Sequence, residues 1–150
     1  MAESNLKVPL IIRVPGLPAR QVDQAVSLID LLPTILELAG DTPAKRDAFV
    51  PPLKGRSLIP TFVGQATKAS PIYGETVPTD RSSLRFSWLK GNLKLRFDGP
   101  QNTWSLFDVS RDPLEQADLS TQRRATTRAL QTEVKGFRSN FNFDGKGSFP

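Results

Sequence analysis

The sequence contains no cysteine and no histidine among its 150 residues. Without cysteine, the chain can form no disulfide, no thiolate metal site and no cysteine nucleophile. Without histidine, it lacks the commonest general base near neutral pH and the commonest metal ligand. These absences exclude zinc chemistry and serine–histidine catalysis by this chain alone.

Long apolar runs are absent as well. No run approaches the roughly 20 residues of a membrane span, and residues 1–30 lack the charged start and apolar middle of a secretory signal peptide. We therefore expect no membrane partner, and the sequence leaves the cellular compartment open.

Positive charge exceeds negative charge, with 20 Lys and Arg against 15 Asp and Glu, a net charge of +5. The densest basic group is Arg123, Arg124 and Arg128, on an expected helix. A solvated helix face is the simpler interpretation, because no aromatic residues interleave with these arginines to stack on bases. We expect no nucleic-acid partner.

An almost continuous apolar run occupies residues 8–14, with the sequence VPLIIRV. Such a run is typical of a strand buried on both faces of a parallel sheet, and Pro9 at its beginning is compatible with a strand. A strand of this kind needs parallel neighbours and two helical layers, yet the chain contains no repeated βαβ units. We expect its neighbours to lie outside this chain.

A helix is predicted within residues 27–40, SLIDLLPTILELAG, in spite of Pro33. Proline is tolerated in the first helical turn, so we expect the helix to start at Asp30, with its carboxylate capping the Leu32 amide rather than acting in catalysis. Gly40 is expected to end the helix in the left-handed conformation. The apolar residues at helical spacing predict one face packed on a core: Ile29, Leu32, Ile35, Leu36 and Ala39.

Alternating patterns begin after residue 70. The stretch LRFSWLKGNLKLRF (84–97) predicts an antiparallel hairpin with one apolar face, a possible strand precedes it at 71–75, and a third follows at 103–107. Residues 121–138 predict a helix that turns Leu130, Val134 and Phe137 towards this sheet.

The order of motifs resembles that of the C-terminal part of a sulfatase, a member of the alkaline-phosphatase-like superfamily. The motifs are VPLIIRVPG, SLIDLLPTILELAG, GRSLIP, a hairpin ending LKLRF, and SLFDVSRDPLEQADLS. Phe107 stands where the family usually has Tyr, and Asp118 where it usually has Asn.

The resemblance implies an α/β to α+β class, a partial alkaline-phosphatase-like fold. One central-sheet strand and a helix are followed by a small antiparallel sheet packed on a C-terminal helix. Residues 1–66 would be the incomplete C-terminal end of the catalytic domain, 67–138 a small C-terminal subdomain, and 139–150 an irregular tail.

The resemblance also implies a function. Sulfatases use calcium and a formylglycine made within a Cys/Ser-x-Pro-Ser/Thr-x-Arg motif, and the sequence contains neither that motif nor the family's acidic pairs at matching positions. We therefore assign no catalytic, cofactor-binding or metal-binding residue to this chain. Its role would be structural and at the substrate entrance, with the missing N-terminal catalytic segment as partner and a sulfated small molecule or glycan as substrate. Family members are often periplasmic, secreted or lysosomal.

A second hypothesis is a non-enzymatic module that binds a polyanion or glycan through its positive charge. It uses no catalytic residue.

Several individual residues allow a functional and a structural interpretation, and the structural one is simpler in each case. Ser57 lacks the spacing of a nucleophile elbow and suits a cap or turn. Lys94, which matches a family lysine, is expected to be an exposed strand charge. Tyr73 and Trp88 could line a substrate mouth but are expected to pack in a core or interface. The role of Arg13 depends on the missing segment.

Three acidic residues surround one predicted turn: Asp108, Asp112 and Glu115. They could bind a cation, but turn and helix-start chemistry explains them better.

Overall fold

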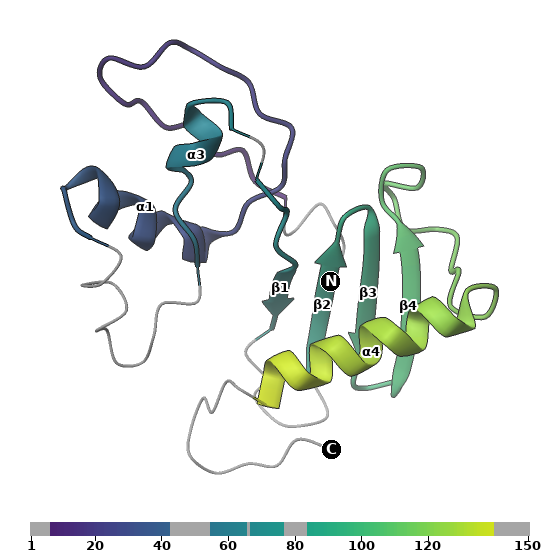
Figure 1. Cartoon of the computed structure of the whole chain (residues 1–150). Coiled ribbons are helices and arrows are strands. Elements are labelled where there is room, and N and C mark those ends of the chain that lie inside the picture. The colour runs from purple at the N-terminus through teal and green to yellow at the C-terminus, as the bar shows by residue number, and fades with distance from the viewer. Residues whose placement is uncertain (1–6, 43–54, 66, 77–83, 140–150) are drawn as a thin grey trace. The chain divides into compact units, whose positions relative to one another are not determined.

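The computed structural model describes residues 7–42, 55–65, 67–76 and 84–139. The chain forms two compact units, one of residues 10–70 and the other of residues 71–150 together with 1–9. We call them the helical unit and the sheet unit. Figure 1 shows α1 and α3 in the former, and the four strands and α4 in the latter.

The sheet unit is built on one antiparallel sheet in the order β1-β2-β3-β4. Its strands are β1 (Ile72–Glu75), β2 (Arg85–Lys90), β3 (Leu93–Asp98) and β4 (Thr103–Asp108). The predicted hairpin is confirmed: β2 and β3 pair with Trp88 opposite Leu95. Gly91 lies in the tight turn between them with φ +60°, a conformation that favours glycine.

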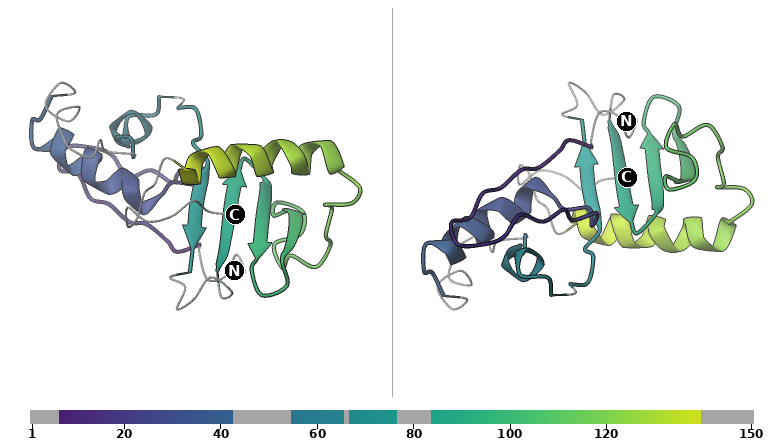
Figure 2. Two further views of the ribbon diagram at one scale, coloured as in Figure 1. Left: turned by 90° about the horizontal axis from the view of Figure 1, so that it is seen from below. Right: turned by 90° about the horizontal axis from the view of Figure 1, so that it is seen from above.

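Helix α4 (Arg124–Ser139) lies across one face of this sheet (Figure 2). Alternate strand residues meet the apolar stripe of the helix. The resulting core contains Phe86, Trp88, Leu95, Leu106, Leu130 and Val134. The predicted helix packed on the sheet is confirmed, although it begins at Arg124 instead of about 121. Beyond Ser139, the tail predicted for 139–150 lies outside the described residues.

In the helical unit, a 3-10 turn η2 (Leu28–Asp30) leads into α1 (Leu31–Leu38). Pro33 lies in the first turn of α1 and Gly40 follows its end with φ +85°, both as predicted. The predicted cap on Leu32 is wrong, because Asp30 makes no side-chain cap bond there. Its Oδ2 accepts from the Ser27 amide at 3.0 Å, and its Oδ1 accepts from the Arg56 amide at 2.9 Å.

The GRSL motif (residues 55–58) is hydrogen-bonded to the start of α1. The Leu58 amide donates to Thr34 Oγ1 at 2.9 Å, and Thr34 Oγ1 donates to the Asp30 carbonyl at 2.5 Å. The backbone of Gly55 lies so close to that of Ile29 that a Cβ atom at position 55 would overlap the Ile29 carbonyl group. Short helix α3 (Ile59–Phe62) follows. Ser57 has the turn role predicted for it, since its Oγ accepts from the Ile59 amide at 3.2 Å.

The two apolar segments expected to be buried are exposed in this chain. Residues 8–14 form no strand, and Ile11 is 91% exposed; a strand exists only where a neighbour pairs with its backbone, and the described strands pair among themselves. The prediction of a packed face on α1 is also wrong for the described residues, because Ile35 is 60% exposed. Pro33 and Thr34 are the buried residues of α1.

Candidate functional site

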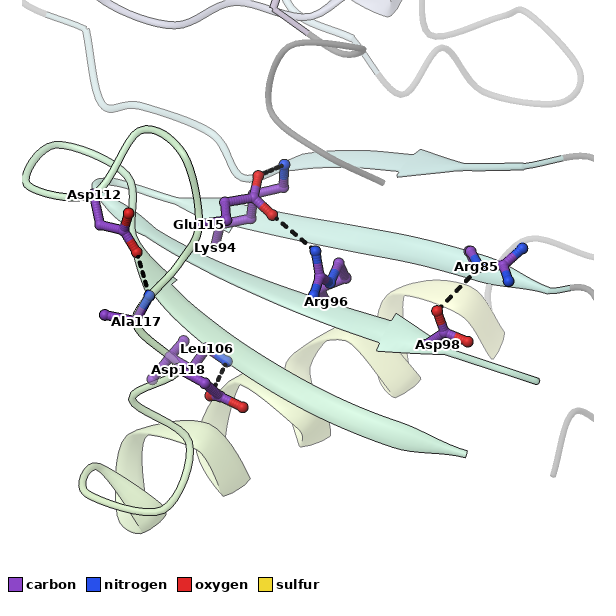
Figure 3. Close-up of polar contacts among 9 residues, drawn as sticks. All are labelled: Arg85, Lys94, Arg96, Asp98, Leu106, Asp112, Glu115, Ala117 and Asp118. Atoms are coloured by element: carbon purple, nitrogen blue, oxygen red, sulfur yellow. Dashed lines mark hydrogen bonds and ion pairs between the residues drawn. The ribbon is translucent and has the colours of Figure 1, made fainter. Parts of the chain in front are cut away.

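Polar side chains gather on the sheet face opposite α4 (Figure 3). Side chains alternate between the two faces of a strand, so on β3 Lys94, Arg96 and Asp98 lie opposite the helix-facing residues. Arg85 of β2 is the register partner of Asp98 on β3. These side chains make three ion-pair contacts on this face, Arg85 with Asp98 and both Lys94 and Arg96 with Glu115.

Lys94 and Glu115 form a buried ion pair at its centre. Lys94 Nζ lies 2.7 Å from Glu115 Oε1, and the two side chains are 1% and 3% exposed. Arg96 Nη1 lies 3.2 Å from the other carboxylate oxygen of Glu115. The prediction of an exposed Lys94 is wrong, because Glu115, in the segment that follows β4, comes to lie against this face of the sheet.

The segment after β4 is held by side-chain to backbone hydrogen bonds. Asp112 Oδ2 accepts from the Ala117 amide at 2.8 Å, and Asp108 Oδ1 accepts from the Ser110 amide at 3.2 Å. The turn role predicted for these two aspartates is thus confirmed. Glu115 ends the same turn, since its amide donates to the Asp112 carbonyl at 3.1 Å. Its carboxylate was not expected to pair with β3, and its φ of +54° is a strained conformation for a non-glycine residue.

Asp118 covers the free edge of β4. Its Oδ1 accepts from the Leu106 amide at 3.0 Å and from the Ser120 amide at 2.8 Å. The Leu119 amide donates to the Leu106 carbonyl at 2.8 Å. Burial by itself would raise the pKa of Asp118, but these amide donors outweigh it and lower the pKa. The sequence indicated only that Asp118 replaces the Asn usual in the family, and it did not predict these hydrogen bonds.

Two guanidinium groups remain partly exposed on this face, with the Arg85 and Arg96 side chains 40% and 31% exposed. Arg85 Nε lies 3.1 Å from Asp98 Oδ2, and Arg96 stacks 4.9 Å from the Phe107 ring centroid. Burial opposes ionisation of Asp98, but the hydrogen bonds from Arg85 and the Gln101 amide lower its pKa. Neither arginine was singled out from the sequence, since strand alternation alone does not distinguish them from other surface cations.

The chemistry available here is anion recognition. Among the described residues of this face, three cations (Arg85, Lys94 and Arg96) lie against two carboxylates, those of Asp98 and Glu115. Guanidinium groups donate fork-shaped pairs of hydrogen bonds that suit oxyanions.

Tyr73 and Trp88 lie on the other face of the sheet. Their rings are 5.3 Å and 4.9 Å from that of Phe137 on α4, which confirms the predicted core packing. Burial, reinforced by the hydrogen bond to Glu75, raises the pKa of Tyr73 and keeps its hydroxyl protonated. Arg13 is exposed in the helical unit.

The acidic side chains of the described residues do not fit a calcium site. No group of three His, Cys, Asp or Glu gathers among them, and the carboxylates of Asp30, Glu115 and Asp118 already accept bonds from amides or cations. A formylglycine has no precursor motif in this sequence. No chemical step through either group is derived for this chain.

A membrane span requires about 20 consecutive, mainly apolar residues. None of the described helices has the length and apolar content needed to cross a bilayer.

Known sulfatases are similar to this chain over most of its length. Arylsulfatase K from Bos taurus is 29% identical over 147 residues, covering 90% of this chain and 26% of the relative. A sulfatase from Schizosaccharomyces pombe is 31% identical over 134 residues, covering 80% and 23%. The solved structure of a 2-O GAG sulfatase is 26% identical with a TM-score of 0.55, covering 79% of this chain and 26% of that chain.

The chain thus spans about a quarter of the length of these relatives. The family model for the C-terminal part of N-sulphoglucosamine sulphohydrolase matches residues 1–140. That range contains the interlocked α1 and GRSL motifs, the antiparallel sheet and α4. The chain therefore belongs to the N-sulphoglucosamine sulphohydrolase C-terminal family, among the sulfatases of the alkaline-phosphatase-like superfamily.

Proposed function

We propose that this chain is the C-terminal part of a sulfatase-type hydrolase of sulfuric esters and is not catalytic alone. Residues 1–66 would complete the central sheet of a catalytic segment, and residues 67–138 would help to form the substrate entrance. The catalytic segment would supply the formylglycine and the calcium ion.

The observation that carries the proposal is the set of exposed apolar residues between Val8 and Leu38. Soluble proteins rarely expose so many large apolar side chains within one segment unless a partner covers them. The exposed members are Val8, Leu10, Ile11, Ile12, Leu17, Val22, Leu28, Ile29, Leu32, Ile35 and Leu38. A run such as 8–14 suits a strand with parallel neighbours on both sides, and the outer face of α1 suits a helix that covers such a sheet.

The proposed entrance is the sheet face that bears Arg85 and Arg96. A sulfate ester carries a fixed negative charge, which partly exposed guanidinium groups attract and orient. One similar structure is named a 2-O GAG sulfatase, so a sulfated glycan is the substrate class that we favour over a sulfated small molecule. Glu115 and Asp98 would hold the two arginines in place.

The test is complementation in solution. The chain is mixed with the N-terminal three-quarters of an arylsulfatase K, produced with its formylglycine and with calcium, and hydrolysis of a fluorogenic aryl sulfate is followed. We expect neither part to hydrolyse the ester and the mixture to do so. Ile35→Glu should abolish association, since it places a charge on the surface to be covered.

Arg111→Gln is the matched control, because Arg111 is exposed and far along the chain from the apolar set. It should complement as well as the unmodified chain. Hydrolysis by the chain alone, above a buffer blank, would contradict the proposal. So would complementation by Ile35→Glu equal to that by the control.

A non-enzymatic glycan-binding module is the second candidate function. The observation in its favour is the excess of basic over acidic side chains on α4. It ranks second because the family to which the chain belongs is named for a hydrolase.

A further inference from the structure

Three basic residues form a line along the solvent side of α4: Arg124, Arg128 and Lys135, which we call the α4 stripe. At 100° per residue, positions i, i+4 and i+11 project within about 40° of one another. They extend over about 16 Å of helix, at about 1.5 Å per residue. All three are exposed.

The stripe carries charge that no acidic neighbour in the described part of the chain neutralises. Glu133 is the one acidic residue of α4. It forms an ion pair with Lys90 of β2, in which Glu133 Oε1 lies 2.6 Å from Lys90 Nζ. No ion pair or hydrogen bond among the described residues involves the side chains of the stripe. The structure therefore leaves three cations available on one helix face.

These cations do not stabilise the fold through packing. The buried residues of α4 are Thr127, Leu130, Val134 and Arg138, and they occupy the side that faces the sheet. Like charges at i and i+4 repel one another and weaken a helix slightly. Folding thus gives no reason for a line of positive charge on the outer side.

We propose that the α4 stripe binds a sulfated polysaccharide, as a contact separate from the sheet face described above. A line of cations on a convex surface suits a chain of repeated anions better than a single small anion, which would need an enclosing site. Single-stranded nucleic acid is less suitable, because the one aromatic residue of α4, Phe137, packs on the sheet and leaves no ring to stack on bases. The stripe would then hold a long substrate at a distance from its reacting sulfate.

Binding of heparin to the 150-residue chain tests the inference directly, by calorimetry at several salt concentrations. The triple variant Arg124→Gln, Arg128→Gln, Lys135→Gln should weaken binding by at least about tenfold, because three charge contacts are lost. The slope of log K against log salt should fall by about 3. Glutamine preserves helix propensity, and tryptophan fluorescence checks that the sheet unit is intact.

The matched control removes the same charge from exposed sites elsewhere, with Lys7→Gln, Lys68→Gln and Arg111→Gln. It should change affinity by less than about threefold, because these three exposed charges come from separate segments of the chain and form no line along one helix. A second variant, Arg124→Lys with Arg128→Lys, keeps the charge and should retain binding. Equal losses in the triple and control variants would overturn the inference, as would equal affinity for desulfated heparin or tighter binding to a DNA duplex.

This inference rests on the proposed function in one respect only, which is that the polyanion bound by the α4 stripe is sulfated. A chain that binds heparin through the stripe but does not complement the catalytic segment would refute the proposed function alone. A chain that complements but does not bind heparin would refute the stripe alone.

Discussion

The two units of this chain treat their apolar residues in opposite ways. The sheet unit buries its apolar residues between the sheet and α4, with Leu95, Leu106 and Val134 at 0% exposure. The helical unit exposes most of its own and buries Leu58 beside the polar residues Asp30, Thr34 and Thr61. One unit is therefore complete as a hydrophobic core, whereas the other is specified mainly by hydrogen bonds.

This difference shows how a segment can have a defined local shape before its apolar surface is covered. Asp30 and Thr34 connect η2, α1 and the GRSL motif through four backbone partners: Ser27, Arg56, Asp30 and Leu58. Those bonds fix the direction of α1 without using its apolar face, which stays available for a partner.

The largest effect should come from Glu115→Ala in the sheet unit. Removing one partner of a buried ion pair costs about 3–5 kcal/mol, and here it takes away the carboxylate that lies 2.7 Å from the buried Lys94 ammonium. Urea unfolding followed by tryptophan fluorescence measures the loss, since both tryptophans of the chain, Trp88 and Trp104, lie in the sheet unit. The double variant Lys94→Met, Glu115→Leu should recover much of the stability, and a double variant as unstable as the single one would contradict this account.

Apolar truncations compare the two units most directly. Leu106→Ala should lower the free energy of unfolding by about 2–5 kcal/mol, because it opens a cavity in a closed core. Ile35→Ala should stay within about 0.5 kcal/mol in the isolated chain, because its side chain is exposed. Calorimetry of both variants checks this; a large loss for Ile35→Ala would mean that α1 is already packed.

A smaller effect is expected from Gly55→Ala in the helical unit. The new methyl group overlaps the Ile29 carbonyl, and the forced shift should cost about 1–3 kcal/mol. Amide chemical shifts should move in residues 27–34 and 55–62, while the tryptophan unfolding midpoint stays constant. Gly136→Ala is the control, because a Cβ there meets open space, and it should stabilise α4 by about 0.5–1 kcal/mol.

The smallest effect is expected for the contribution of Asp118 to stability at low pH. The lowered pKa of Asp118 means that its contribution to stability is present above the unfolded value near 3.9 and is lost as pH falls through the folded pKa. Asp118→Asn keeps an acceptor for the Leu106 and Ser120 amides, so stability at pH 7 should change little. Its unfolding midpoint should then fall less than that of the unmodified chain between pH 5 and pH 2; parallel curves would argue against this role.

The sequence by itself determined the local elements and the family. Period-two alternation predicted β2, β3 and β4, the 3.6-residue period predicted α4, and Pro33 with Gly40 delimited α1, because these signals depend on residues close together in the chain. The order of motifs along the chain already indicated a sulfatase.

Only the tertiary structure decided the environment of Lys94 and of the apolar face of α1. A period indicates which side of an element a residue lies on, but not what comes to cover that side. Glu115, 21 positions further along the chain, buries Lys94, whereas nothing in the described chain covers Ile35. Burial is a property of contacts between distant segments, so it required the folded chain.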